Sequence, residues 1–330
     1  YPRLLTFGLL ITYIFEWINF DTFINYLILG YYLRLFCIAI YSFYVYIPSF
    51  QFRLPSNWQA MLRYSSLIFL SGAAASFILD IDKSMIFAIT SDKNVAFYAV
   101  AIYIAAVVEA PGRAMFQITS PLVANALNAN DLLRLEVLLK KSSANLMVVS
   151  GLAFLIINLN LLDFYEIINQ EGYASAFSVV IIVSLGKFFS MSMGCINNII
   201  SNSKYYSYVF WFSVTSALFA VILNYYLITS YGILGAALAT LIVIVFINIC
   251  KIILIYIIFK IHPYNNKSLS IVGSVFLIYW IVYFIPTMAH PFISILMRSF
   301  LIIVLFLIPL FTFRWSTDLE AIFKQIKNQF

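Results

Sequence analysis

The chain has few charged residues. Asp, Glu, Lys and Arg make up 10% of its 330 residues, whereas a soluble domain carries about 25%. Hydrophobic residues make up 64%. We therefore expect an integral membrane protein. Because the apolar runs are continuous over about 20 residues and do not alternate with polar residues, they predict spanning helices and not a β-barrel.

Cysteine and histidine are also scarce. The three cysteines lie in apolar runs without a CxxC motif, and His262 and His290 lie beside prolines without metal-ligand spacing. The sequence has no phosphate-binding glycine loop, GxSxG or HExxH motif. We therefore expect no enzyme activity, no metal and no cofactor, and a coupling H⁺ or Na⁺ gradient is the energy source left open. The net charge of +6 does not indicate nucleic-acid binding, because most cations lie in short loops.

About ten spans are predicted, which makes the fold an all-α polytopic membrane protein. Their approximate limits are 4–20, 23–47, 65–90, 95–126, 143–161, 174–200, 207–229, 232–258, 268–286 and 291–313. The tail 314–330 has the pattern of an amphipathic helix on the membrane surface.

The loops predict an orientation. Twelve cations fall on alternate loops and ends, and one falls on the opposite loops: the first set is Arg3, Arg53, Arg63, Arg134, Lys140, Lys141, Lys204, Lys260, Lys267, Arg314, Lys324 and Lys327. The positive-inside rule places both ends in the cytoplasm. The localisation expected is the inner (cytoplasmic) membrane.

Three cations lie deep inside apolar runs: Arg34, Arg113 and Lys187. Each costs about 2.5–3.5 kcal/mol at mid-membrane on insertion scales. We expect them to line a cavity for an anionic substrate. No acid lies within one turn of Lys187, so its partner is expected from another helix, from water or from a substrate. Lys251 and Arg298 are close enough to span ends to snorkel.

Acids also lie within the spans. Asp80, Asp82 and Lys83 close the third span, either as interface residues or as an ion site, and Glu109 shares a helix face with Arg113 and can pair with it. Pro111 predicts a kink beside these two residues. Broken helices with charges beside the break are typical of transporters.

The seventh and eighth spans contain Asn224-Tyr225-Tyr226-Leu227-Ile228 and Tyr231-Gly232-Ile233-Leu234-Gly235-Ala236-Ala237-Leu238-Ala239-Thr240. This hairpin resembles one in polysaccharide (O-antigen type) flippases of the multidrug/oligosaccharidyl-lipid/polysaccharide exporter superfamily, with Asn224, Gly232 and Gly235 as its structural residues. Asp82-Lys83 followed by Val95 to Ala101 resembles the start of the family's C-terminal lobe. Ala96, where the family usually has glycine, and the glycine-free loop at Ser201 to Lys204 depart from the pattern.

The resemblance implies a two-lobed transporter of 12–14 helices that works by alternating access. Residues 1–50 would be the last two helices of an incomplete N-terminal lobe, 51–63 a cytoplasmic linker, 64–258 the six-helix C-terminal lobe and 259–313 a final helix pair, followed by the tail 314–330. The chain begins at Tyr1 beside an apolar run, so an N-terminally truncated member is expected.

The substrate implied is a polyprenyl-pyrophosphate-linked oligosaccharide, moved from the inner to the outer leaflet, with membrane lipids, a glycan polymerase and assembly proteins as partners. Arg34, Arg113 and Lys187 would bind its anionic groups, and Asp80, Asp82, Lys83 and Glu109 would couple or gate ion movement. Two alternatives remain open, a cation-coupled multidrug exporter and a non-transporting scaffold, whereas a membrane enzyme of glycan assembly is not expected because neither a large outer loop nor an intramembrane histidine is present.

Overall fold

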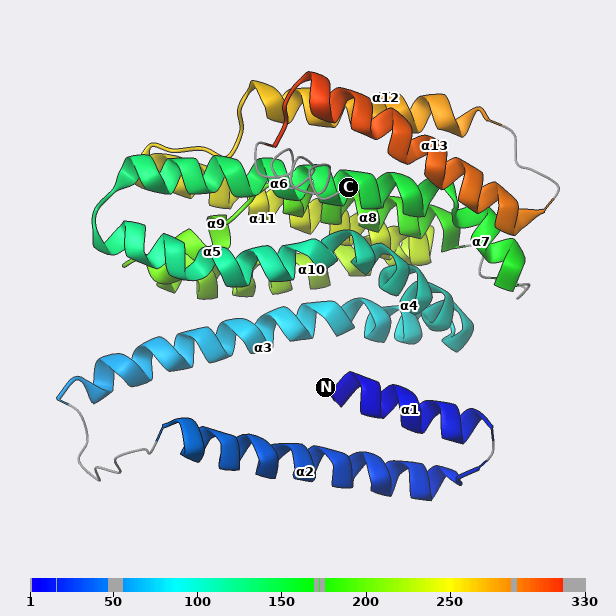
Figure 1. Ribbon diagram of the computed structural model, residues 1–330, viewed down its shortest axis with the longest axis horizontal. Helices are drawn as coiled ribbons and strands as arrows, with labels where there is room; N and C mark the ends of the chain where they lie inside the picture. The colour runs from blue at the N-terminus through cyan, green and yellow to red at the C-terminus, as the bar shows by residue number, and fades with distance from the viewer. Residues whose placement is uncertain are drawn as a thin grey trace, which may run out of the picture. The chain divides into compact units, whose positions relative to one another are not determined.

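The computed structural model describes residues 2–15, 17–46, 56–168, 172, 176–285 and 290–316, without the side chains at 2–5, 14, 71 and 74–79. Every regular element in these ranges is a helix (Figure 1). Seven of the helices are long and apolar enough to cross a membrane. The prediction of an all-α polytopic membrane protein is therefore confirmed.

The candidate spans match eight of the ten predicted ones. The seven single spans are Phe20–Val45, Asp92–Asn128, Leu132–Leu159, Ser207–Tyr231, Ile233–Phe259, Asn266–Tyr283 and Pro291–Thr312. The eighth is a bent pair of helices, Phe177–Met191 and Ile196–Asn202, with 55° between them. The span Leu132–Leu159 begins 11 residues before the predicted limit of 143, because the polar stretch that contains Lys140 and Lys141 is also helical.

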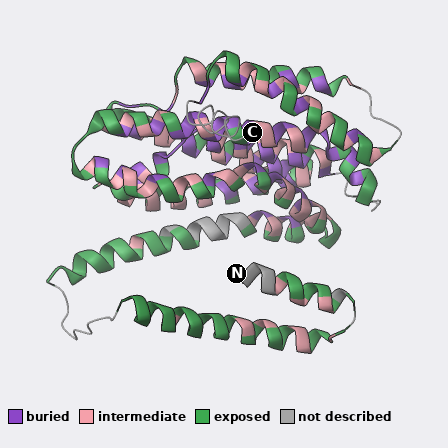
Figure 2. Cartoon of the chain, viewed as in Figure 1, coloured by how far each residue is buried: buried purple, intermediate pink, exposed green. Residues whose placement is uncertain are grey.

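The chain divides into two compact units, 1–60 and 61–330. In the first unit, α1 (Pro2–Ile14) and α2 (Phe20–Val45) form an antiparallel hairpin (Figure 1). At about 1.5 Å per residue α1 is about 20 Å long, less than the roughly 30 Å of a bilayer core. The described part of the predicted span 4–20 is thus shorter than a bilayer crossing. None of the residues of α2 is buried (Figure 2).

The second unit begins in α3 (Trp58–Ile89), a 32-residue helix. It starts inside the segment 51–63 that was predicted to be a linker, and residues 51–55 lie outside the described part of the chain. The apolar sequence from Trp58 onward lacks proline, so the helix begins seven residues before the predicted span limit of 65.

The rest of the second unit is a helical bundle. Its members are α4 (Asp92–Ala106), the short 3₁₀ helix η1 (Val107–Glu109), α5 (Ala110–Asn128), α6 (Leu132–Leu159), α7 (Leu161–Ile168), α8 (Phe177–Met191), α9 (Ile196–Asn202), α10 (Ser207–Tyr231) and α11 (Ile233–Phe259). The turn from α5 to α6 illustrates how sequence sets the connections. Asn130 adopts φ 52°, which asparagine tolerates, and the Asp131 side chain caps α6 by accepting from the Arg134 N–H at 2.9 Å.

One span is bent and another contains a 3₁₀ turn. Pro111 lies in the first turn of α5, where its missing N–H is tolerated, and η1 lies just before it within the span Asp92–Asn128. The kink expected beside Pro111 stays a prediction. Between α8 and α9, Gly194 adopts φ 59°, a region that favours glycine. Two serines of α6 satisfy backbone groups at this bend. Ser143 donates to the Ser192 carbonyl at 2.6 Å, and Ser142 accepts from the Cys195 N–H at 3.0 Å.

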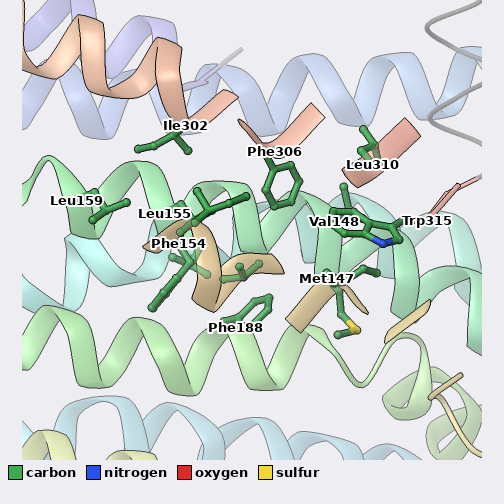
Figure 3. Packing of buried hydrophobic residues seen from close by; sticks show 14 of the residues in the cluster. Met147, Val148, Phe154, Leu155, Leu159, Phe188, Ile302, Phe306, Leu310 and Trp315 are labelled. Carbon is green, nitrogen blue, oxygen red and sulfur yellow. The ribbon is translucent and has the colours of Figure 1, made fainter. Parts of the chain in front are cut away.

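The final helix pair, α12 (Asn266–Tyr283) and α13 (Pro291–Thr312), packs on α6. Figure 3 shows the apolar cluster between them, in which Phe306, Leu155 and Phe188 interdigitate. Trp315 is buried in this cluster and donates from its indole N–H to Ser270 at 3.1 Å. The predicted surface tail 314–330 therefore begins with a buried anchor, and 317–330 lies outside the described residues.

Candidate functional site

The candidate site is built around an ion pair between Glu109 and Lys187. The Lys187 ammonium donates to the Glu109 carboxylate, which joins the span α4–α5 to α8. Both residues lie near the middle of their spans. The Lys187 side chain is 17% exposed and that of Glu109 36%. The expected partner of Lys187 does come from another helix, and the predicted pairing of Glu109 with Arg113 does not form.

Local backbone chemistry places this pair. Glu109 ends η1 and lies directly before α5, whose first turn contains Pro111. Gly186 precedes Lys187, and a Cβ at Gly186 would come within 3.3 Å of the Leu241 side chain. Absence of that Cβ lets α11 pack closely against α8 and fixes the helix that carries the lysine.

Arg113 lies one helical turn after Glu109 and is exposed on the surface of the second unit. No described residue forms an ion pair with it. A charge at this depth is too costly to face lipid, because the cost is about 2.5–3.5 kcal/mol on insertion scales. This face must therefore meet water, protein or a ligand. Of the predicted deep cations in the second unit, Arg113 is free to bind an anion, whereas Lys187 is already neutralised by Glu109.

Another ion pair lies near the end of α3. Lys83 pairs with Asp80 at 3.1 Å, and its ammonium lies 5.6 Å from the ring centroid of Tyr103 on α4. The Asp80 side chain is 73% exposed, so this pair contributes little to stability. Lys83 and Asp80 thus form an accessible outer group of charges, separated along α4 and η1 from Glu109.

Asp82 behaves differently from its neighbours on α3. It is 6% exposed, and its carboxylate accepts hydrogen bonds from the Tyr98 hydroxyl at 2.8 Å, the Asn224 amide at 2.5 Å and the Thr240 hydroxyl at 2.7 Å. These partners come from α4, α10 and α11. The interpretation of Asp82 as an interface residue is wrong, because its side chain is buried at the junction of four helices.

The glycines of the predicted hairpin bring Asn224 and Thr240 together. Gly232 adopts φ 58° at the turn between α10 and α11. A Cβ at Gly235 would lie 1.9 Å from the Leu227 carbonyl oxygen, so only glycine fits where the two helices approach. The resemblance named Asn224 as structural. Neither Tyr98 nor Thr240 was predicted to meet Asp82, although both lie in the sequence stretches that carry the resemblance.

The remaining predicted residues lie elsewhere. Arg34 is on α2 in the first unit, where its side chain is exposed. Arg298 does not snorkel: it pairs with Asp163 at 3.3 Å and donates to the carbonyls of Leu159 at 3.1 Å and Ile285 at 2.7 Å. This network attaches α13 to α7 and the end of α6.

The site offers charged groups for ionic contacts. An exposed guanidinium lies one helical turn from a carboxylate–ammonium pair, and a guanidinium is suited to hold an anion. Within the described ranges no cluster of three or more His, Cys, Asp or Glu residues could hold a metal ion.

Three comparisons with known proteins were negative. No family model matches the chain, no curated protein matches it, and no solved structure matches it.

Proposed function

We propose that this protein is a flippase that moves a polyprenyl-pyrophosphate-linked oligosaccharide from the inner to the outer leaflet for cell-surface polysaccharide synthesis. It would act as the C-terminal lobe, the final helix pair and part of the N-terminal lobe of a two-lobed, alternating-access transporter in the bacterial inner membrane, with both ends cytoplasmic. Its partners would be membrane lipids, a glycan polymerase and assembly proteins.

The observation that carries the proposal is the mid-span arrangement of an unpaired Arg113 beside the Glu109–Lys187 pair. Arg113 is suited to bidentate contact with a phosphate. Phosphate bound there would compete with Glu109 for Lys187. Substrate arrival would thus rearrange the Glu109–Lys187 pair.

Asp82 supports a coupling role of another kind. Its carboxylate lies among oxygen-bearing side chains, and the Asn224 side-chain oxygen has no hydrogen-bond partner although it is buried. Carboxylate, amide and hydroxyl oxygens are the ligands that hard cations prefer. Coupling through H⁺ or Na⁺ would act here, where four helices meet, and Asp80 and Lys83 would gate access from the exposed side.

Reconstituted protein tests the proposal directly. Proteoliposomes are loaded with a fluorescent polyprenyl-pyrophosphate oligosaccharide, and its movement between leaflets is compared with that of a cationic dye. We expect movement of the glycan, and a loss of at least tenfold in Arg113→Gln, while Arg134→Gln, an exposed arginine near the start of α6, behaves as wild type. Movement of the dye alone would instead support the multidrug exporter, which Glu109 and Asp82 favour as acids within spans.

A further inference from the structure

A polar cavity lies between α9, α10 and α11. Its volume is about 220 Å³, several times the roughly 30 Å³ of one water molecule. Apolar residues such as Phe212 and Ile247 form part of its wall, and Lys251 lies in it with four polar residues: Asn197, Ser201, Ser213 and Ser216. It shares no lining residue with the Glu109–Lys187 site.

Lys251 is a cation without a counter-ion in this cavity. It lies eight residues before the end of α11 at Phe259, about 12 Å at 1.5 Å per residue. Its ammonium donates to the Asn197 side-chain oxygen at 3.0 Å and does not reach for the membrane surface. None of the residues lining the cavity is acidic. A half-buried ammonium with only a neutral acceptor has lost hydration without gaining a charge partner.

The other groups at the cavity complete a set of donors. Because the Asn197 oxygen accepts from Lys251, the amide nitrogen of Asn197 keeps its two N–H groups available. The hydroxyls of Ser213 and Ser216 donate to helix carbonyls, Val209 at 3.0 Å and Ser213 at 2.9 Å, and can rotate toward a stronger acceptor. An ammonium, an amide N–H and hydroxyls all donate hydrogen bonds, and no lining carboxylate repels a negative charge. This set of groups therefore suits an oxyanion.

We propose that this cavity is an anion site that binds a phosphate group, with Lys251 as its charge partner and Asn197 and Ser201 as additional donors. The phosphate can be free in solution or belong to a lipid headgroup. The site stands apart from the proposed transport function, because it uses different residues and a binding measurement tests it.

Thermal unfolding of the purified chain in neutral detergent tests the site at constant ionic strength. The probes are inorganic phosphate, short-chain phosphatidylglycerol and, as the zwitterionic reference without net charge, short-chain phosphatidylcholine. We expect phosphate or phosphatidylglycerol to raise the wild-type midpoint by about 2–4 °C at several-fold excess over the dissociation constant. Lys251→Gln should lose this shift, while Lys93→Gln, at an exposed lysine at the start of α4, should keep it.

Phosphate also stabilises proteins generally by exclusion from their surface, and that effect would move all variants equally. Equal shifts in wild type and Lys251→Gln, or no shift in wild type with either anionic probe, would overturn the proposal. If Lys251→Gln does not fold, Ser213→Leu serves instead, because its side chain fills the cavity and leaves the lysine in place. Retention of the wild-type phosphate response in that variant would also overturn it. A response to only one probe identifies the source of the phosphate.

Discussion

Asn224 donates a 2.5 Å hydrogen bond to Asp82, a residue 142 positions earlier in the chain. The bond ties the hairpin α10–α11 to the end of α3. Tyr98 and Thr240 add bonds from two more helices to the same carboxylate. A single buried acid therefore holds together helices that are far apart in the sequence.

Replacement of Asp82 by Asn should destabilise the protein. Because asparagine is uncharged and has one acceptor oxygen, all three donors lose a charged acceptor and at least one of them loses its acceptor altogether, at a cost of about 2–3 kcal/mol. Chemical unfolding in detergent measures the change. Asp80→Asn is the matched control, because its exposed side chain pairs only with Lys83, and it should change the stability by less than about 0.5 kcal/mol. Equal effects of the two variants would contradict the assignment of Asp82 as the buried junction.

The Glu109–Lys187 pair should show coupling in a double-mutant cycle. Glu109→Gln leaves the ammonium of Lys187 without a charged partner, and Lys187→Gln does the same to the carboxylate, at about 1–3 kcal/mol each. The double variant removes both charges and should be more stable than the sum of the single losses predicts. Additive losses would mean that the two side chains act independently.

Arg113→Gln should separate transport from stability. Arg113 is exposed and makes no ion pair within the described chain, so we expect its unfolding midpoint to stay within about 1 °C of wild type. Glycan translocation should fall at least tenfold, as argued above. A variant that transports normally would remove Arg113 from the site, and one that unfolds early would show a structural role for it.

The Arg298–Asp163 pair should fix the final helix pair to the bundle. Asp163 is 1% exposed, so Arg298→Met leaves a buried carboxylate whose remaining partner is the Ser294 hydroxyl at 2.9 Å. We expect a loss of about 3 kcal/mol, recovered in large part when Asp163→Asn is added. Amide hydrogen exchange on α13 reports the loosening locally, and protection unchanged from wild type would refute this role.

Gly194→Ala should be among the most damaging small substitutions in the chain. The residue has φ 59°, and an added Cβ would lie 2.7 Å from both the Ser142 hydroxyl and the Ser143 backbone nitrogen. We expect a loss of at least about 2 kcal/mol. Gly273→Ala in α12 is the matched control, since open space surrounds that position, and it should be neutral or stabilising by up to about 1 kcal/mol.

Hydrophobic patterning predicted the helices well because a span is a local property. Eight candidate spans follow from residue type and order alone. The partners of Lys187 and Asp82 could not be predicted in this way, because they depend on which helix faces which. Lys187 has no acid within a turn, and its partner is 78 residues earlier.

The sequence also did not predict burial for residues of the same type at different positions on one helix. Asp80 and Asp82 are two residues apart, and one side chain is solvent-exposed while the other is enclosed. Trp315 looked like part of a surface tail, yet it is packed against Phe306. Both outcomes depend on the neighbouring helices, which no local pattern contains.

The chain bends by 55° between α8 and α9, and contacts from a third helix hold this bend in place. The hydroxyls of Ser142 and Ser143 hold its backbone from α6, and the space that a pivot would need is filled around Gly194. The bend between α8 and α9 is therefore fixed by contacts from α6 and is not a hinge. A change of the 55° angle between α8 and α9 would therefore require these contacts from α6 to break.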